Sequence, residues 1–301
     1  MQYFGPLKAQ RIYQQSQSLF LLILFCSLVF FSEQTSAQGD LLIFPKRVVF
    51  EGDKKSQVIT LSNLGKDTAT YNISIVQIRM NEDGRFENIL QPDPGQLFAD
   101  TFLRFYPRTV TLAPNESQVV KIQLTKTNGL KPGEYRSHLY FRAVPKAVSP
   151  HKIQNDSSSI SVRLTAIFGI TIATIIRVGE SNTNVTISNL SFEKLNDSIP
   201  VLHMEFDRTG NMSVYGDITV KYISPKGKAT KVGEIQGFAV YTPNDKRICK
   251  MSLSSDVSID YSSGELSVEY STQPDAKSLL IAQQNLKLQP LLLNESAEKQ
   301  H

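Results

Sequence analysis

Long apolar runs are nearly absent from this sequence. The strongest candidate, Leu19–Phe31, has 13 residues, whereas a membrane-spanning helix needs roughly 17 to 25. Lys8 and Arg11 precede the run, and the small residues Thr35-Ser36-Ala37 follow it. This is the pattern of a cleaved secretory signal. We therefore expect residues 1–37 to be a signal peptide, with a retained membrane anchor as the alternative.

Cysteine is also scarce, because the sequence holds only Cys26 and Cys249. Cys26 lies inside the expected signal peptide, so the mature chain would keep one cysteine and form no internal disulfide. Small extracellular domains of eukaryotes commonly depend on disulfides. Their absence from an exported chain favours a bacterial protein of the periplasm, with cores large enough to fold alone.

Motifs for covalent chemistry are missing as well. No histidine stands near another histidine or a cysteine at a zinc-binding spacing, and no nucleophile elbow, dinucleotide loop, P-loop or HExxH motif occurs. His138 and His203 are expected to be solvated or hydrogen-bonded strand residues, and Cys249 a packed, inert one. The net charge of +4 is too small and too interspersed to indicate nucleic acid. We expect no enzyme, no metal and no cofactor.

Helical periodicity is lacking too, and short alternating segments bounded by Pro, Gly and Asn predict strands instead. Such strands without intervening helices indicate antiparallel sandwiches or barrels. The expected strands are 41–50, 56–62, 71–75, 102–106, 110–112, 117–124, 135–141, 160–176, 185–193, 201–207, 215–223, 231–241, 247–253, 264–270 and 278–288.

The polar segment 177–184 contains Gly179 and has no repeating apolar face, so it predicts a domain boundary. We expect an all-β chain with two immunoglobulin-like sandwiches in tandem, at residues 38–178 and 183–289, followed by a tail at 290–301. A Pro-Gly turn before Tyr135 at a strand start also suits the tyrosine corner of such sandwiches.

The segment Ile160–Ile176 is the most unusual feature that is present. It is expected to form one unbroken strand whose even-numbered residues are mostly apolar, and it is longer than the usual 3 to 10 residues. Its opposite face begins polar, with Ser161, Arg163 and Thr165. We therefore expect its first half to lie at a sheet edge, where another chain could bind.

Several motifs occur in a distinctive order: Arg47-Val48-Val49-Phe50-Glu51-Gly52, Tyr106-Pro107-Arg108, Leu112-Ala113-Pro114-Asn115-Glu116, Tyr135–Phe141 and then the long strand. In this order the chain resembles the PapD-like periplasmic pilus-assembly chaperones. The resemblance is good over residues 41–177 and only architectural beyond them.

The resemblance implies a chaperone that binds fimbrial or surface-fibre subunits by donor-strand complementation and delivers them to an outer-membrane usher. The donor residues would be Ile160, Val162, Leu164 and Ala166. The family also holds the terminal carboxylate of the subunit with an Arg on the first strand and a Lys on the last. Arg47 matches the Arg, but alignment of the donor residues puts Gly169 at the place of the Lys. The alternative to a chaperone is a structural or adhesive surface protein of tandem immunoglobulin-like domains.

Overall fold

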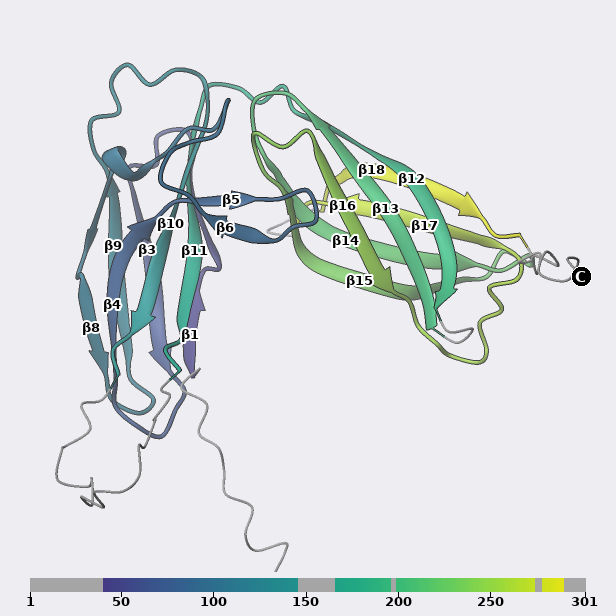
Figure 1. The fold of residues 1–301 in the computed structure, drawn as a ribbon, viewed down its shortest axis with the longest axis horizontal. Coiled ribbons are helices and arrows are strands. Elements are labelled where there is room, and N and C mark those ends of the chain that lie inside the picture. Colours follow the sequence, from purple (N-terminus) through teal and green to yellow (C-terminus); the bar gives the residue numbers. More distant parts are fainter. Residues whose placement is uncertain (1–39, 146–165, 196–198, 274–277, 290–301) are drawn as a thin grey trace, which may run out of the picture. The chain divides into compact units, whose positions relative to one another are not determined.

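The computed structural model describes residues 40–145, 166–195, 199–273 and 278–289. The predicted signal peptide, the tail 290–301 and the donor residues Ile160, Val162 and Leu164 lie outside these ranges. The described residues from Leu41 onward belong to one compact unit. They are built from strands, with a single turn of 3-10 helix at Asp100–Phe102 (Figure 1). In the described part of the chain, no helix has the length and apolarity to cross a membrane.

The first sandwich consists of two facing sheets. One sheet has the order β1-β3-β9-β7 and the other β2-β11-β10-β4-β8. In an immunoglobulin sandwich strands A, B, E and D form one sheet and C, F and G the other, which is the arrangement seen here. The strands are β1 (Leu41–Phe44), β2 (Arg47–Phe50), β3 (Ser56–Asn63), β4 (Ala69–Val76), β7 (Leu103–Tyr106), β8 (Thr109–Leu112), β9 (Ser117–Leu124), β10 (Gly133–Ala143) and β11 (Gly169–Val178).

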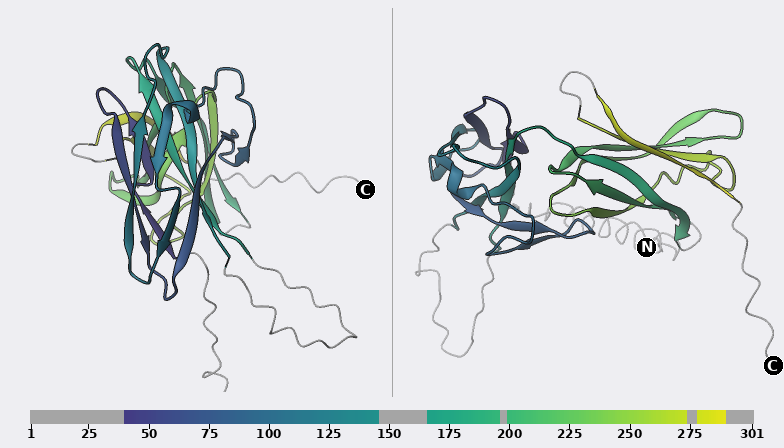
Figure 2. Two further views of the ribbon diagram at one scale, coloured as in Figure 1. Left: turned by 90° about the vertical axis from the view of Figure 1, so that its left-hand side faces the viewer. Right: turned by 90° about the horizontal axis from the view of Figure 1, so that it is seen from above.

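The second sandwich has a sheet of order β12-β13-β16 and a sheet of order β15-β14-β17-β18. Every pairing in it is antiparallel. Its strands are β12 (Asn184–Leu195), β13 (Ile199–Thr209), β14 (Val214–Ile223), β15 (Ala229–Val240), β16 (Lys246–Ser252), β17 (Glu265–Ser271) and β18 (Leu280–Lys287). In chain order these are strands A, B and E against C′, C, F and G. The predicted fold class, two immunoglobulin-like sandwiches, is confirmed, and two further views in Figure 2 show the same strand architecture.

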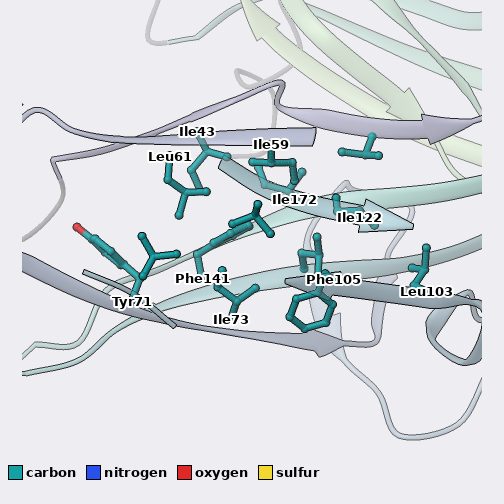
Figure 3. Packing of buried hydrophobic residues seen from close by; sticks show 14 of the residues in the cluster. Ile43, Ile59, Leu61, Tyr71, Ile73, Leu103, Phe105, Ile122, Phe141 and Ile172 are labelled. Carbon is teal, nitrogen blue, oxygen red and sulfur yellow. The ribbon is translucent and has the colours of Figure 1, made fainter. Parts of the chain in front are cut away.

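The core of the first sandwich follows from the alternation of apolar residues. Ile59 and Leu61 of β3 are fully buried, and so are Leu139 and Phe141 of β10 in the facing sheet. Figure 3 shows such side chains from the two sheets pointing toward one another. Because successive strand residues point to opposite faces, the other face of each sheet is left for solvent or for other contacts.

The tyrosine corner predicted at Tyr135 is confirmed. The Tyr135 hydroxyl accepts a hydrogen bond from the backbone N–H of Lys131 at 3.1 Å and donates one to the carbonyl oxygen of the same residue at 3.2 Å. The ring of Phe102 packs edge-on against Tyr135, with 5.6 Å between centroids. The corner therefore ties the turn before β10 to the strand itself.

Two strand predictions are wrong in extent. The single strand expected at 41–50 is two strands, because the chain leaves one sheet after Phe44, passes Pro45, which has no N–H to donate, and enters the other sheet at Arg47. The long strand expected to run from Ile160 through Ile176 is assigned from Gly169 among the described residues. Its neighbour β10 ends at Ala143, so Ala166 and Ile167 have no ladder to join.

A short hairpin of β5 (Ile78–Met80) and β6 (Phe86–Asn88) was not predicted as strands. The hairpin forms a sheet of its own beside the two sandwich layers (Figure 1). Its backbone bonds to residues of the second sandwich, since Ile248 N–H donates to Glu82 O at 2.7 Å and Asn244 Nδ2 donates to Met80 O at 2.7 Å.

Candidate functional site

The N-terminal half of β11 has an open edge. Residues Ala173–Ile176 pair with β10 on one side and with the parallel strand β2 on the other. Gly169–Ile172 pair with β10 alone, since no strand in the described ranges lies on their other side. Strand β1, which could have continued β2 along this edge, pairs with β3 in the opposite sheet. An unpaired strand edge is a template for another chain.

The chain that leads into this edge is exposed. Ala166 is exposed, and Ile167 and Phe168 keep 42% and 47% of their surface in solvent. The carbonyl of Phe168 accepts a hydrogen bond from Ala143 N–H at 3.0 Å. The last residue of β10 therefore holds the end of this exposed segment. Among the predicted donor residues, Ala166 is therefore accessible and lies beside the open edge.

Arg47 begins β2 and lies directly opposite Ala173 of β11. Its guanidinium stacks over the ring of Tyr215, 4.5 Å from the centroid, and is 5.8 Å from that of Tyr241. Both tyrosines belong to the second sandwich. The Nη1 atom is buried and has no hydrogen-bond partner among the described residues. Because a buried guanidinium N–H without an acceptor is costly, this atom is a candidate donor to an anionic ligand.

Gly169 does not take part in this arrangement. It pairs with Arg142, four residues before Ala173 along β11. A Cβ atom at Gly169 would overlap the Tyr140 ring, so any larger residue there requires Tyr140 to move. A lysine at the aligned position would therefore have to displace this ring.

A buried ionic network lies next to Arg47 on the same face of the sheet. Glu134 accepts hydrogen bonds from the backbone N–H of Ser213 at 3.0 Å and from its hydroxyl at 2.6 Å. Its carboxylate is 3.2 Å from Arg136 and 3.5 Å from Arg177. Burial raises the pKa of Glu134, but Arg136, Ser213, Arg177 and Arg47 outweigh it and hold that pKa below its ordinary value. The carboxylate is therefore charged at neutral pH.

The two arginines of the network are committed to backbone atoms of the second sandwich. Arg136 Nη2 donates to Thr242 O at 2.6 Å, and Arg177 Nη2 donates to Ser213 O at 2.8 Å. Apolar residues from both sandwiches, including Ala173, Ile175 and Tyr241, form a small buried cluster beside them. Together these contacts join the outer face of the β2-β11-β10 sheet to the second sandwich.

His138 differs from its prediction. It was expected to be solvated or hydrogen-bonded, yet it is only 4% exposed and its Nδ1 has no hydrogen-bond partner in the described chain. Burial, with the charges of Arg136 and Arg47, lowers the pKa of His138 to about 3. The imidazole is therefore neutral. The reason for the difference is that the outer face of β10 is covered, which strand alternation alone does not reveal.

The other singled-out residues match their expected environments. Cys249 is buried, and burial raises the pKa of its thiol to about 11, as expected of a packed cysteine. His203 is partly exposed, and its Nε2 lies 2.8 Å from Glu193. No group of three or more metal-ligating side chains occurs among the residues that the structure describes.

Sequence reasoning missed the aromatic and acidic side of the site. Tyr215 and Tyr241 lie 168 and 194 residues from Arg47 along the chain, and nothing in their local pattern marks them. Glu134, Arg136 and His138 share one face of β10. Because ionisable residues at alternate positions of a strand are typical of a solvated face, they gave no signal that this face is covered.

Comparison with known proteins gives the following likenesses. A model of Fn3-like domains matches residues 49–143. No curated protein sequence matches the chain. In structure, the chain is similar to a chain of the CsuC–CsuE chaperone–tip adhesion subunit pre-assembly complex from the archaic chaperone-usher Csu pili of Acinetobacter baumannii. That likeness has 12% identity and a TM-score of 0.42, and it covers 80% of this chain and 96% of that chain.

Two further solved structures are similar. The class 5 fimbriae chaperone CfaA has 16% identity and a TM-score of 0.38, with 83% of this chain and 100% of that chain covered. The E. coli chaperone DraB has 12% identity and a TM-score of 0.37, with 83% and 96% covered. The solved structures to which this chain is similar thus include chaperones of fimbriae and pili.

Proposed function

We propose that this chain is a periplasmic chaperone that binds fimbrial or surface-fibre subunits by donor-strand complementation and delivers them to an outer-membrane usher. The observation that carries the proposal is the open edge of β11 at Gly169–Ile172, preceded by exposed residues at 166–168. The function requires no covalent chemistry. It requires a strand that can pair with the subunit and complete the subunit's sheet.

The physical basis is burial. A subunit that lacks its last strand exposes an apolar groove and an unpaired backbone edge, which would otherwise aggregate. In the proposal Ile160, Val162, Leu164 and Ala166 fill the groove while their backbone pairs with its edge. Burial of three or four such side chains supplies roughly 5 to 10 kcal/mol before the cost of association. Burial of the donor side chains is therefore a substantial part of the proposed binding free energy.

Arg47 is proposed to anchor the terminal carboxylate of the subunit. A guanidinium can hold a carboxylate with two parallel hydrogen bonds. Its unpartnered Nη1 and its position on β2, beside β11, support this role. The anchor would fix the register of the client along the donor strand, because a polypeptide held at its terminus can slide no further.

Charged substitutions on the donor face test the proposal. Val162→Asp and Leu164→Asp should each reduce retention of a co-expressed fimbrial subunit at least tenfold, because the carboxylate would be buried unpaired. Ser161→Asp, which the alternation of the sequence predicts to point away from the groove, is the matched control and should retain the subunit. Affinity purification of the chaperone from a periplasmic extract measures the retained amount, and equal retention by all three variants would count against strand donation.

Three parts of the proposal need tests of their own. N-terminal sequencing of the mature protein from the periplasm should find Gln38 first, because we infer cleavage after Ala37. Limited proteolysis should yield separate fragments for residues 38–178 and 183–289. Delivery predicts that the loaded chaperone binds the usher and that the chaperone alone binds it more weakly.

A further inference from the structure

Arg47 and His138 lie on either side of one small residue. Ala173 of β11 pairs with Arg47 of β2 and with His138 of β10. Paired residues of adjacent strands project from the same face of a sheet, so all three share the outer face. Since strands are about 4.8 Å apart, the two Cα atoms are separated by roughly two strand spacings. The methyl group of Ala173 lies between the two longer side chains and packs in a buried cluster with Met80, Ala239 and Tyr241.

Both side chains carry a buried nitrogen that is not used within the protein. Arg47 Nη1 and His138 Nδ1 have no hydrogen-bond partner among the described residues. His138 is 96% buried, since only 4% of its surface is exposed. Buried polar groups are normally satisfied, and each exception needs an explanation. Two such exceptions beside the same alanine indicate a shared ligand.

The two neighbouring arginines, Arg136 and Arg177, already bind groups within the protein through their Nη atoms. The guanidinium of Arg136 contacts Thr242 and Glu134. The guanidinium of Arg177 contacts Ser213 and Glu134. The Nη donors of both would have to break existing contacts before they could bind a ligand, although Arg136 Nε and Arg177 Nε are also buried without a hydrogen-bond partner among the described residues. His138 would have to break none at Nδ1.

We propose that His138 is the second carboxylate-binding group of this chain, which donates a hydrogen bond from Nδ1–H to one of the carboxylate oxygens that Arg47 binds, at the remaining lone pair of that oxygen. The inference rests on the proposed function, since it assigns the partner of Arg47 at the same anchor. It replaces a lysine on the last strand with a histidine on the neighbouring strand, and so explains why Gly169 can be a glycine.

A histidine in this position binds the carboxylate as a neutral donor. Arg136 and Arg47 are the charged groups that act on it, and together with burial they keep the ring uncharged. Arg47 supplies the positive charge, and His138 supplies a second hydrogen-bond donor. A neutral imidazole has one N–H and one acceptor nitrogen, so the tautomer with the proton on Nδ1 is the binding form.

Phe86 of the β5–β6 hairpin packs near the ring of His138. The ring of Phe86 is 6.3 Å from that of His138 and 6.4 Å from that of Tyr241, between ring centroids, while 56% of Phe86 remains exposed. A half-exposed aromatic ring can swing outward at small cost. Replacement of Phe86 by Ala should therefore open the site without disturbing either binding group.

The test uses acetate as the probe and the uncharged acetamide as its control. NMR of the 15N-labelled mature protein would follow the histidine ring nitrogens and the Arg47 guanidinium during each titration. Comparison with the His138→Phe and Arg47→Lys variants assigns the signals. Acetate, and not acetamide, should shift both the His138 and the Arg47 signals with one saturation curve, in the wild type and in Phe86→Ala.

The variants then separate a binding role from a structural one. His138→Phe should weaken acetate binding at Arg47 about tenfold, the loss of one hydrogen bond. His138→Asn, which keeps a donor, should recover most of it, and His203→Phe should have no effect. If acetate shifts Arg47 alone, the role of His138 is refuted and the Arg47 anchor stands. If it shifts neither group, even in Phe86→Ala, both are refuted, while strand donation is still judged by subunit retention.

Discussion

Removal of the Glu134 carboxylate should destabilise the protein strongly. The side chain is fully buried and accepts two hydrogen bonds from Ser213, at 3.0 and 2.6 Å. Hydrogen bonds to a charged group contribute about 1.5 to 3 kcal/mol each. The substitution also leaves Arg136 buried without its counter-charge, and breaking a buried pair in this way costs about 3 to 5 kcal/mol. The two figures overlap, because the cost of removing one partner of a buried pair already includes its lost hydrogen bonds, so we expect Glu134→Ala to lower the free energy of unfolding by about 3 to 5 kcal/mol.

Urea denaturation followed by far-UV circular dichroism measures this loss, since the chain has no tryptophan to report by fluorescence. The matched control is Glu269→Ala. Glu269 pairs with Lys221 at 2.7 Å, but both side chains are partly exposed, so its loss should stay below about 1 kcal/mol. Similar losses for Glu134→Ala and Glu269→Ala would refute the reasoning that burial makes the Glu134 network strong.

The same carboxylate predicts a pH dependence. Its folded-state pKa is held below the ordinary value, so the unfolded chain binds the proton more tightly than the folded protein does. The stabilisation is fully present above the unfolded pKa of about 4.3 and is lost as the pH falls through the folded pKa. Glu134→Gln should remove this part of the acid dependence. If the free energy of unfolding of the variant falls with decreasing pH as steeply as that of the wild type, the reasoning is contradicted.

Three further predictions concern single residues. Tyr135→Phe should cost about 1 kcal/mol by urea denaturation, since it removes the hydrogen bonds of the corner; Tyr106→Phe, at an exposed position, should cost nothing measurable. Cys249 should react with a thiol reagent at neutral pH only in the unfolded protein, because burial raises its pKa to about 11; rapid labelling of the native protein would show that the thiol is accessible in the folded state. Gly169→Ala should lower the free energy of unfolding, because the added Cβ meets the Tyr140 ring. In the Tyr140→Ala background the same substitution should cost less, and an equal loss in both backgrounds would contradict this.

The alternation of apolar residues was sufficient to predict most strands. Ser117–Leu124 was predicted with the bounds that β9 has, and Tyr215–Ile223 differs from β14 by one residue. The corner at Tyr135 was predictable for the same reason, since its hydroxyl bonds to a residue only four positions away. Hydrophobic periodicity and turn chemistry act over short stretches of chain, so the sequence alone reports them.

Where strands end and which outer faces are covered depended on distant residues. β11 is assigned from Gly169 because its neighbour stops at Ala143, and the segment 41–50 divides because its halves join different sheets. Arg47 meets Tyr215 and Tyr241, and His138 is buried beneath Phe86, although both residues alternate like surface residues in the sequence. Periodicity gives two faces to every strand, but only tertiary packing decides whether the second face meets solvent or another layer of protein.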